Sequence, residues 1–192
     1  MNKTLRPLIF SALLAAISMV LFLLQASTPL TPAFLKLDIS DLPALIASLF
    51  LGAPYGVLVC LVKNALGLFH SMTGGIGELS NFLLSSIFVL TVGFVYKKRR
   101  SQGNALLATF LGALAMAAFS FPSNLFLVYP VYTKIMSLDA IMGMYSAILP
   151  SVNRLWQALL IFNVPFTFVK AMLSFVLMIP LYPLLRRLDM RK

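Results

Sequence analysis

The chain has 192 residues, of which 60% are hydrophobic and only 10% charged, and its mean hydropathy is +0.97. This composition excludes an ordinary soluble domain and predicts an all-α integral membrane protein, a single bundle in a lipid bilayer. The formal net charge of +10 would suit a nucleic-acid partner. However, Lys and Arg residues that flank apolar segments act as membrane topology signals, so we expect no nucleic-acid binding. Ten of the fifteen basic residues flank such segments: Lys3, Arg6, Lys97, Lys98, Arg99, Arg100, Arg186, Arg187, Arg191 and Lys192.

The first apolar segment, residues 7–25, is long enough to cross a bilayer. The sequence ASTPLTP follows and ends it, because its prolines cannot continue a helix. A cleaved signal peptide is the alternative interpretation, with Lys3 and Arg6 as its basic region. The apolar run exceeds the usual length of a signal-peptide core, which favours a retained membrane span.

Residues 42–62 form the next uncharged stretch, which the sequence GAPYG interrupts at positions 52–56. Ser40 or Asp41 can cap a helix that begins near Leu42, and the glycines and proline of the interruption end it. We therefore expect a short helix followed by a second helix, rather than one continuous span.

The number of crossings follows from where the basic residues must lie. A single crossing by residues 42–62 would give five spans. It would also place either the basic loop at 97–103 or both charged termini outside, which the positive-inside rule disfavours. We therefore predict six transmembrane helices, with both termini and the basic loop in the cytoplasm, and residues 1–192 forming one domain. The last three spans are expected at residues 76–96, 104–132 and about 165–185.

Lys170 stands alone in the otherwise uncharged stretch 155–185, and an ionisable residue in such a segment usually marks a functional site. Burying its ammonium in hydrocarbon costs at least ~2.5 kcal/mol, so a polar group of the protein or of a ligand should face it. Asn163, Thr167 and Ser174 recur at helical spacing on the same face. The alternative is that Lys170 reaches the membrane interface or pairs within the protein.

A second polar set begins the fourth span, where the glycine-rich residues 73–77 lead into Glu78, Asn81 and Ser85 on one helical face. Glycines let a ligand approach the backbone closely, and a helix N-terminus has free amide donors. Asn124 in the fifth span can offer both a donor and an acceptor to a heteroaromatic ring. Alternatively, Glu78 complements the helix dipole, and both asparagines bond neighbouring helices.

Several other functions are not supported by the residues present. Lys63 has a structural interpretation, either paired with Glu78 or beside an inner cavity. His70 is the only histidine in the sequence, and carboxylates do not cluster near it, so we expect no metal site. The sequence contains no GxxxxGK[ST] phosphate loop and no arrangement of its five acidic residues that suits catalysis. We expect neither an enzyme nor ATP hydrolysis by this chain.

Four segments together resemble a known family: FLKLDISDLPALIASLFLGAPYGVLVCLVKNALGLF, GGIGELSNF, SNLFLVYPVY and PFTFVK. They are similar to the substrate-binding S-component of energy-coupling-factor (ECF) vitamin transporters of the riboflavin type, over nearly the whole chain. The resemblance implies six helices around one vitamin near the outer face of the bacterial plasma membrane. It also implies that an extracellular loop, here residues 28–41, closes over the vitamin.

The resemblance implies roles for particular residues. Asn124 would bond the polar edge of the isoalloxazine ring, and Lys170 would reach its carbonyl side. The family usually has asparagine three residues before this lysine, where the present sequence has Thr167. Either Asn163 compensates, or the ligand is FMN, another flavin or a different vitamin. The further candidates for substrate contact are Leu37 and Asp38 in the loop, with Glu78 and Asn81.

Ala12 and Ala16 form a small-xxx-small face on the first span, which can pack internally or dock a partner. In the resembling family this face contacts the transmembrane coupling subunit, and two separate ATPase subunits energise import. Two alternatives stay open: a stand-alone secondary carrier, and a structural or signalling membrane protein without a small ligand.

Overall fold

The computed structural model describes residues 5–71 and 73–186. Of the basic residues read as topology signals, Lys3, Arg187, Arg191 and Lys192 lie outside these ranges. The helices are α1 (Leu5–Leu23), α2 (Asp41–Phe50), α3 (Ala53–Gly67), α4 (Ile76–Tyr96), α5 (Gln102–Ser123), α6 (Tyr129–Tyr132), α7 (Leu138–Ser146), α8 (Leu155–Ala158) and α9 (Val164–Leu185). A 3-10 turn covers Leu68–His70, and π-helical segments cover Asn124–Val128 and Leu159–Asn163.

Within the part of the chain that the structure describes, five helical stretches are long and apolar enough to cross a membrane: Leu5–Leu23, Ala53–His70, Ile76–Tyr96, Gln102–Tyr132 and Leu155–Leu185. The predicted span at 76–96 is confirmed, and the first and fifth spans lie within two residues of their predicted bounds. The short helix predicted after residue 41 is also present, as the apolar ten-residue α2.

The predicted start of the last span, at about residue 165 or slightly earlier, agrees with the start of α9 at Val164, but the continuous helical stretch already begins at Leu155. Pro165 lacks a backbone N–H, and in a regular helix its ring would clash with a carbonyl one turn earlier. Here the wider π-helical turn of Leu159–Asn163 precedes it, and the helix continues through the proline.

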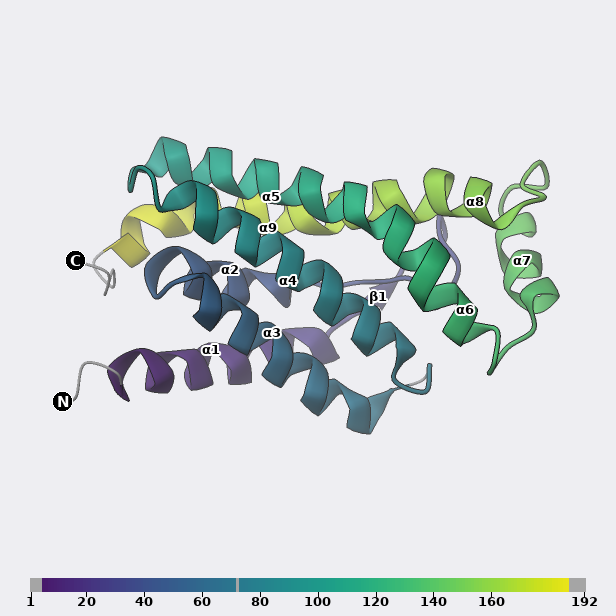
Figure 1. Cartoon of the computed structure of the whole chain (residues 1–192), viewed down its shortest axis with the longest axis horizontal. Coiled ribbons are helices and arrows are strands. Elements are labelled where there is room, and N and C mark those ends of the chain that lie inside the picture. Colours follow the sequence, from purple (N-terminus) through teal and green to yellow (C-terminus); the bar gives the residue numbers. More distant parts are fainter. Residues whose placement is uncertain (1–4, 72, 187–192) are drawn as a thin grey trace.

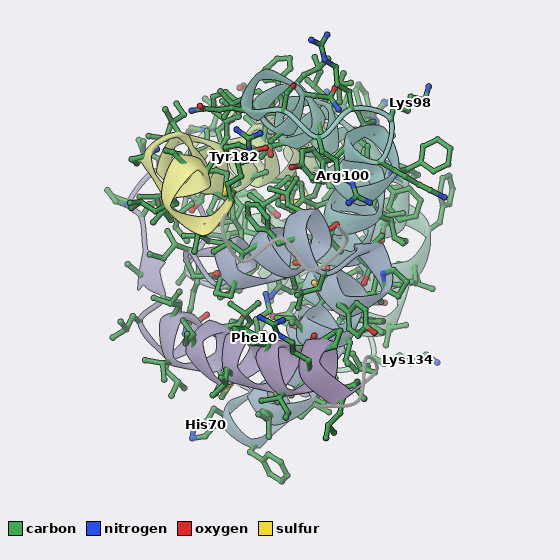
Figure 2. All side chains as sticks on the ribbon, turned by 90° about the vertical axis from the view of Figure 1, so that its left-hand side faces the viewer. Phe10, His70, Lys98, Arg100, Lys134 and Tyr182 are labelled. Atoms are coloured by element: carbon green, nitrogen blue, oxygen red, sulfur yellow. The ribbon has the colours of Figure 1, made fainter. Side chains whose placement is uncertain are left out.

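Figure 1 shows how the bundle is arranged. Helices α5 and α9 run side by side along one edge, α1 and α3 lie along the opposite edge, and α2 and α4 lie between them. The start of α1, the end of α9 and the connection between α4 and α5 share one end, which we call the terminal end. Helix α7 lies at the other, which we call the α7 end. Lys98 and Arg100 project at the terminal end in Figure 2.

The turn between α2 and α3 explains why the GAPYG sequence divides this region. Gly52 has φ of 131°, a conformation that other residues rarely adopt, so the chain can reverse there. A Cβ atom on Gly93 of α4 would lie 2.6 Å from the Cβ atom of Ala53, so α4 passes directly against this turn. Nine of the ten residues of α2 are buried, which makes it the centre of the bundle.

Two apolar clusters hold the helices together. The larger one surrounds α2 and reaches the terminal end, where the hydroxyls of Tyr96 and Tyr182 are hydrogen-bonded at 2.9 Å. The smaller one lies at the α7 end and contains Tyr129, Tyr145 and Phe162. Between α1 and α2, the short strands β1 (Ala26–Ser27) and β2 (Lys36–Leu37) pair antiparallel. Helices and the segment that joins α1 to α2 border the space between the two clusters.

Candidate functional site

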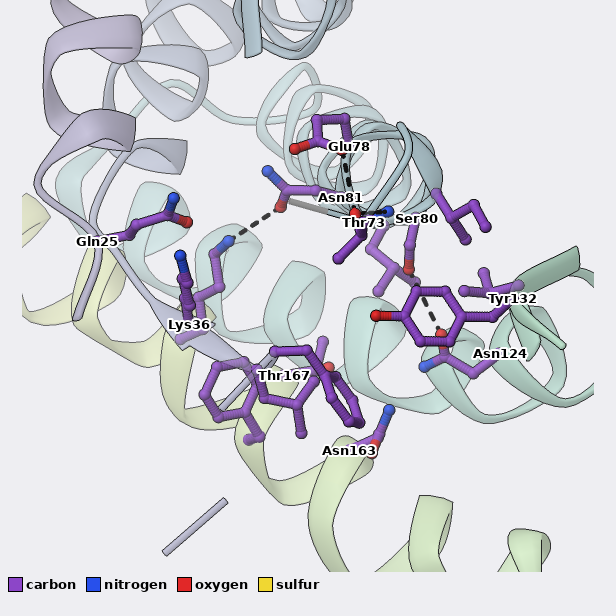
Figure 3. Close-up of a pocket in the computed structure, with 18 of the residues that line it drawn as sticks. Gln25, Lys36, Thr73, Glu78, Ser80, Asn81, Asn124, Tyr132, Asn163 and Thr167 are labelled. Atoms are coloured by element: carbon purple, nitrogen blue, oxygen red, sulfur yellow. Dashed lines mark hydrogen bonds between the residues drawn. The ribbon is translucent and has the colours of Figure 1, made fainter. Parts of the chain in front are cut away.

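A pocket of about 400 Å³ lies between the start of α4, the π-helical segment after α5, the first half of α9 and the segment that joins α1 to α2. This volume falls in the range of about 300 to 1,000 Å³ that is usual for small-molecule sites. The polar side chains that line it, several of them labelled in Figure 3, include Asp38, Thr73, Glu78, Ser80, Asn81, Asn124, Asn163, Thr167 and Lys170. Aromatic side chains that line it include Phe34, Tyr129, Tyr132 and Phe166.

The ammonium of Lys170 is held at one side of this pocket by two side chains. Its Nζ donates to Oδ2 of Asp38 at 2.9 Å and to Oδ1 of Asn81 at 2.9 Å. The prediction that a polar group faces Lys170 is confirmed, and internal pairing, the alternative left open above, is what the structure has. A lysine ammonium has three donors, and these two hydrogen bonds use two of them.

A second buried ion pair lies next to the first. Lys63 is fully buried, and its Nζ lies 2.7 Å from Oδ1 of Asp41 and 3.0 Å from the hydroxyl of Ser40. Pairing of Lys63 with Glu78, one of the possibilities considered above, is therefore wrong. Ser85 also donates to Oδ1 of Asp41, at 2.6 Å. The side chain of Ser40 makes no capping bond to α2.

The two ion pairs form one charge-neutral cluster of Asp38, Asp41, Lys63 and Lys170. The ammonium of Lys170 lies 3.9 Å from Oδ2 of Asp41, and this contact joins the pairs. A buried charge is tolerated when it is paired and hydrogen-bonded, whereas removing one partner leaves an uncompensated charge. The cluster therefore ties the segment before α2 to α2, α3 and α9.

Glu78 organises the turn that precedes α4. Its carboxylate accepts hydrogen bonds from Ser71 at 2.7 Å and from Thr73 at 3.4 Å. Gly74 and Gly75 in this turn have φ of 61° and 88°, which favours glycine at both positions. Glu78 thus has a structural role at the start of α4, and it also lines the pocket.

Two asparagines reach the pocket from the π-helical segments. Asn124 is the first residue of one segment, and Asn163 is the last residue of the other. Each segment ends two residues before a proline, Pro130 or Pro165. π-Helical turns are frequent at functional sites because they alter which side chains a helix presents. Oδ1 of Asn124 accepts a hydrogen bond from Ser80 at 3.4 Å.

The model of the family described as "ECF transporter, substrate-specific component" matches residues 6–182. The chain belongs to this family. The riboflavin transporter RibU of Staphylococcus aureus (strain TCH60) is 31% identical over 92% of this chain and 88% of its own length. The riboflavin transporter FmnP of Bacillus subtilis (strain 168) is 35% identical over 67% of this chain and 69% of its own length.

A solved structure of the same kind agrees with the fold. The S component of a bacterial ECF transporter superimposes with a TM-score of 0.76 at 29% identity, covering 96% of this chain and 97% of that one. The ECF protein described here is accordingly a multi-pass protein of the bacterial cell membrane. Its family is a transporter component and not a class of enzyme.

The remaining predicted residues lie in different surroundings. Leu37 is half-buried in β2, where it pairs with Ala26. It is not among the described residues that line the pocket. Asp38, the next residue, does line it. Ala12 and Ala16 are exposed on α1. These two side chains therefore do not pack inside the bundle, which was one of the two alternatives for the alanine face.

Two aromatic residues of this ECF protein escaped sequence reasoning. Phe34 lines the pocket, with its ring centroid 5.9 Å from that of Tyr132 and 5.8 Å from that of Tyr145. Tyr145 is carried by α7, a helix not predicted above. The signal that could have found α7 is Ser137, whose side chain caps it, with Asp139 in its first turn.

Proposed function

We propose that this ECF protein binds riboflavin, or a closely related flavin, in the described pocket and imports it. The observation that carries the proposal is that two curated relatives, one of them matching nearly the whole chain, are named riboflavin transporters. The pocket has a suitable volume and combines apolar walls with a few polar groups. The energy comes from two ATPase subunits that act through a transmembrane coupling subunit.

Asn124 and Lys170 are the principal ligand contacts in this proposal. The edge of an isoalloxazine ring alternates acceptors with an N–H donor, and an asparagine amide can match both. The third N–H of Lys170 donates to a ring carbonyl while Asp38 and Asn81 hold the other two. Charge-assisted hydrogen bonds of this kind contribute roughly 1.5 to 3 kcal/mol. Glu78, Asn163 and Thr167 supply further polar contacts.

The segment 28–41 is the gate over the flavin. It reaches the bundle at two places: Asp38 pairs with Lys170, and Phe34 packs on the rings of Tyr132 and Tyr145. The pairing of β1 with β2 stiffens the segment between these anchors. Because Asp38 pairs with a proposed ligand-binding lysine, closure of the gate and flavin binding involve the same ammonium.

The chain crosses the membrane six times, with α2 counted as the second crossing and both termini in the cytoplasm. The terminal end supports this topology, because the start of α1, the end of α9 and the basic loop at 97–103 lie together there. The exposed face of Ala12 and Ala16 on α1 meets the coupling subunit, since small side chains permit close helix contact.

Titration of the purified protein with flavin tests this proposal. We expect quenching of riboflavin fluorescence with one-to-one stoichiometry, and a flavin absorption band that remains with the protein after gel filtration. FMN and other water-soluble vitamins, added in parallel, identify the preferred ligand. Saturable binding of another vitamin without binding of any flavin would contradict the proposal. Uptake that follows a proton gradient in cells without the ATPase subunits would instead indicate a secondary carrier.

A further inference from the structure

Three buried side chains at the α7 end form a closed ring of hydrogen bonds. The hydroxyl of Tyr145 on α7 donates to Oδ1 of Asn163 at 2.6 Å. Nδ2 of Asn163 donates to the hydroxyl of Tyr129 at 3.3 Å, and the two tyrosine hydroxyls are hydrogen-bonded to each other. The ring thus connects α7 and α6 to the π-helical segment that carries Asn163.

The distances determine which group donates in each bond. Hydrogen bonds between oxygens are usually shorter than those from N–H to oxygen, so the 2.6 Å contact places the amide oxygen of Asn163 toward Tyr145. The 3.3 Å contact then places its nitrogen toward Tyr129. Burial raises the pKa of Tyr145, which keeps its hydroxyl protonated and able to donate. The hydroxyl of Tyr129 completes the ring by donating to that of Tyr145.

This arrangement leaves one N–H of Asn163 for another acceptor. An asparagine amide has two N–H donors, and Tyr129 takes only one of them. Within residues 5–71 and 73–186, the structure records no acceptor for the second one. Asn163 lines the pocket, and Figure 3 shows its amide nitrogen turned toward the interior. Tyr145 lies outside the described set of lining residues.

We propose that Asn163 donates this second N–H to an acceptor atom of the flavin ring, and that Tyr145 is the positioning residue that fixes the amide for this purpose. The inference rests on the proposed function of the pocket. Without the hydroxyl of Tyr145, only the hydroxyl of Tyr129 holds the amide of Asn163. Because a hydroxyl can donate as well as accept, the amide can then turn and present its oxygen instead of its nitrogen at the pocket surface. In the wild-type protein, helix α7 thus contributes to flavin recognition through Tyr145, which does not touch the ligand.

A double-mutant cycle on riboflavin affinity tests the proposal, with the variants Tyr145→Phe, Asn163→Leu and their combination. We expect Asn163→Leu to weaken binding about tenfold and Tyr145→Phe roughly threefold to tenfold. The combination should bind no more weakly than Asn163→Leu alone, because Tyr145 acts only through Asn163. The matched control is Tyr182→Phe, which removes a hydrogen-bonded buried hydroxyl near the terminal end and should leave affinity unchanged.

Two results would overturn the positioning role. One is an affinity for Tyr145→Phe equal to that of the control, and the other is a full additional loss when Tyr145→Phe is combined with Asn163→Leu. If Asn163→Leu does not fold, Asn163→Ala takes its place in the cycle, with the same expected outcomes. A wild-type protein that binds no flavin overturns the proposed function, which distinguishes that failure from a failure of the ring.

Discussion

The two ends of the bundle use opposite kinds of packing around α2. Toward the terminal end, small residues let helices touch: a Cβ atom on Gly56 would lie 2.9 Å from that of Ser48, and one on Gly112 would lie 2.7 Å from Val92. Toward the α7 end, π-helical turns, paired charges and aromatic rings border an open pocket. The difference indicates that one end keeps the bundle rigid while the other is adapted to hold and release a ligand.

Removing the fully buried charge of Lys63 is expected to have the largest effect. Lys63→Met leaves Asp41 with the more distant Lys170 as its cationic partner and should lower the free energy of unfolding by about 3 to 5 kcal/mol. Thermal unfolding of the purified protein measures this change. The double variant Lys63→Met with Asp41→Asn is the control and should recover much of the loss. Equal unfolding temperatures for the wild type and Lys63→Met would contradict the account of the cluster.

Enlarging a contact of the close-packed region separates stability from binding. Gly93→Ala inserts a methyl group against Ala53 and should destabilise the protein by about 1 to 3 kcal/mol while flavin affinity stays the same. Gly103→Ala is the matched control, because its Cβ would meet nothing within 4 Å. A large loss of flavin affinity in Gly93→Ala with normal stability would contradict the separate roles of the two ends, namely rigid packing at one and ligand binding at the other.

Weakening the gate should accelerate flavin release. Asp38→Asn keeps the shape of the side chain but removes its charge opposite Lys170, so we expect dissociation to accelerate roughly tenfold. Stopped-flow fluorescence measures the rate. Asp139→Asn, at an exposed position on α7, should leave it unchanged. A slower release from Asp38→Asn would show that the ion pair competes with the ligand instead of holding the gate closed.

Lengthening Thr167 is a milder change within the pocket. Thr167→Asn should preserve affinity or tighten it by up to about 1 kcal/mol, because it replaces a hydroxyl with a longer amide group that has a second donor. Titration with riboflavin gives the answer, and Thr133→Asn at an exposed position is the control. Loss of binding in Thr167→Asn alone would mean that the proposed register of this helix, or the flavin itself, is wrong.

The smallest effect on affinity is expected on the outside of α1. Ala12→Leu combined with Ala16→Leu should leave flavin affinity nearly unchanged, since both residues are exposed and remote from the polar groups of the pocket. Uptake by cells that contain the complete transporter should fall, because the larger face no longer fits the coupling subunit. Normal uptake would remove this face from the docking surface, and a parallel loss of flavin binding would show that the face is not independent of the pocket.

Hydropathy and helical spacing were sufficient for much of the helical framework. They located the span at 76–96, the break near Gly52 and the polar face around Lys170, because each of these depends on residues close in sequence. The partner of Lys170 could not be derived in this way. Asp38 is separated from it by 132 positions and belongs to a segment without periodicity.

The details of the pocket depend on irregular backbone that sequence patterns do not reveal. Pro165 was expected to begin a helix, yet the π-helical turn before it carries the helix through and directs Asn163 into the pocket. Tyr145 was not a candidate site residue from the sequence. Its role depends on contacts with Tyr129 and Asn163, which only the folded chain brings together.

The central claim is that the side chains of Lys170 and Asn124 hold a flavin in this pocket. Riboflavin titration of Lys170→Met and Asn124→Ala, beside the matched controls Lys98→Met and Asn104→Ala, tests it most directly. The account predicts that both pocket variants remain folded and bind at least tenfold more weakly, while both controls bind as the wild type does. Wild-type affinity in both pocket variants would contradict it.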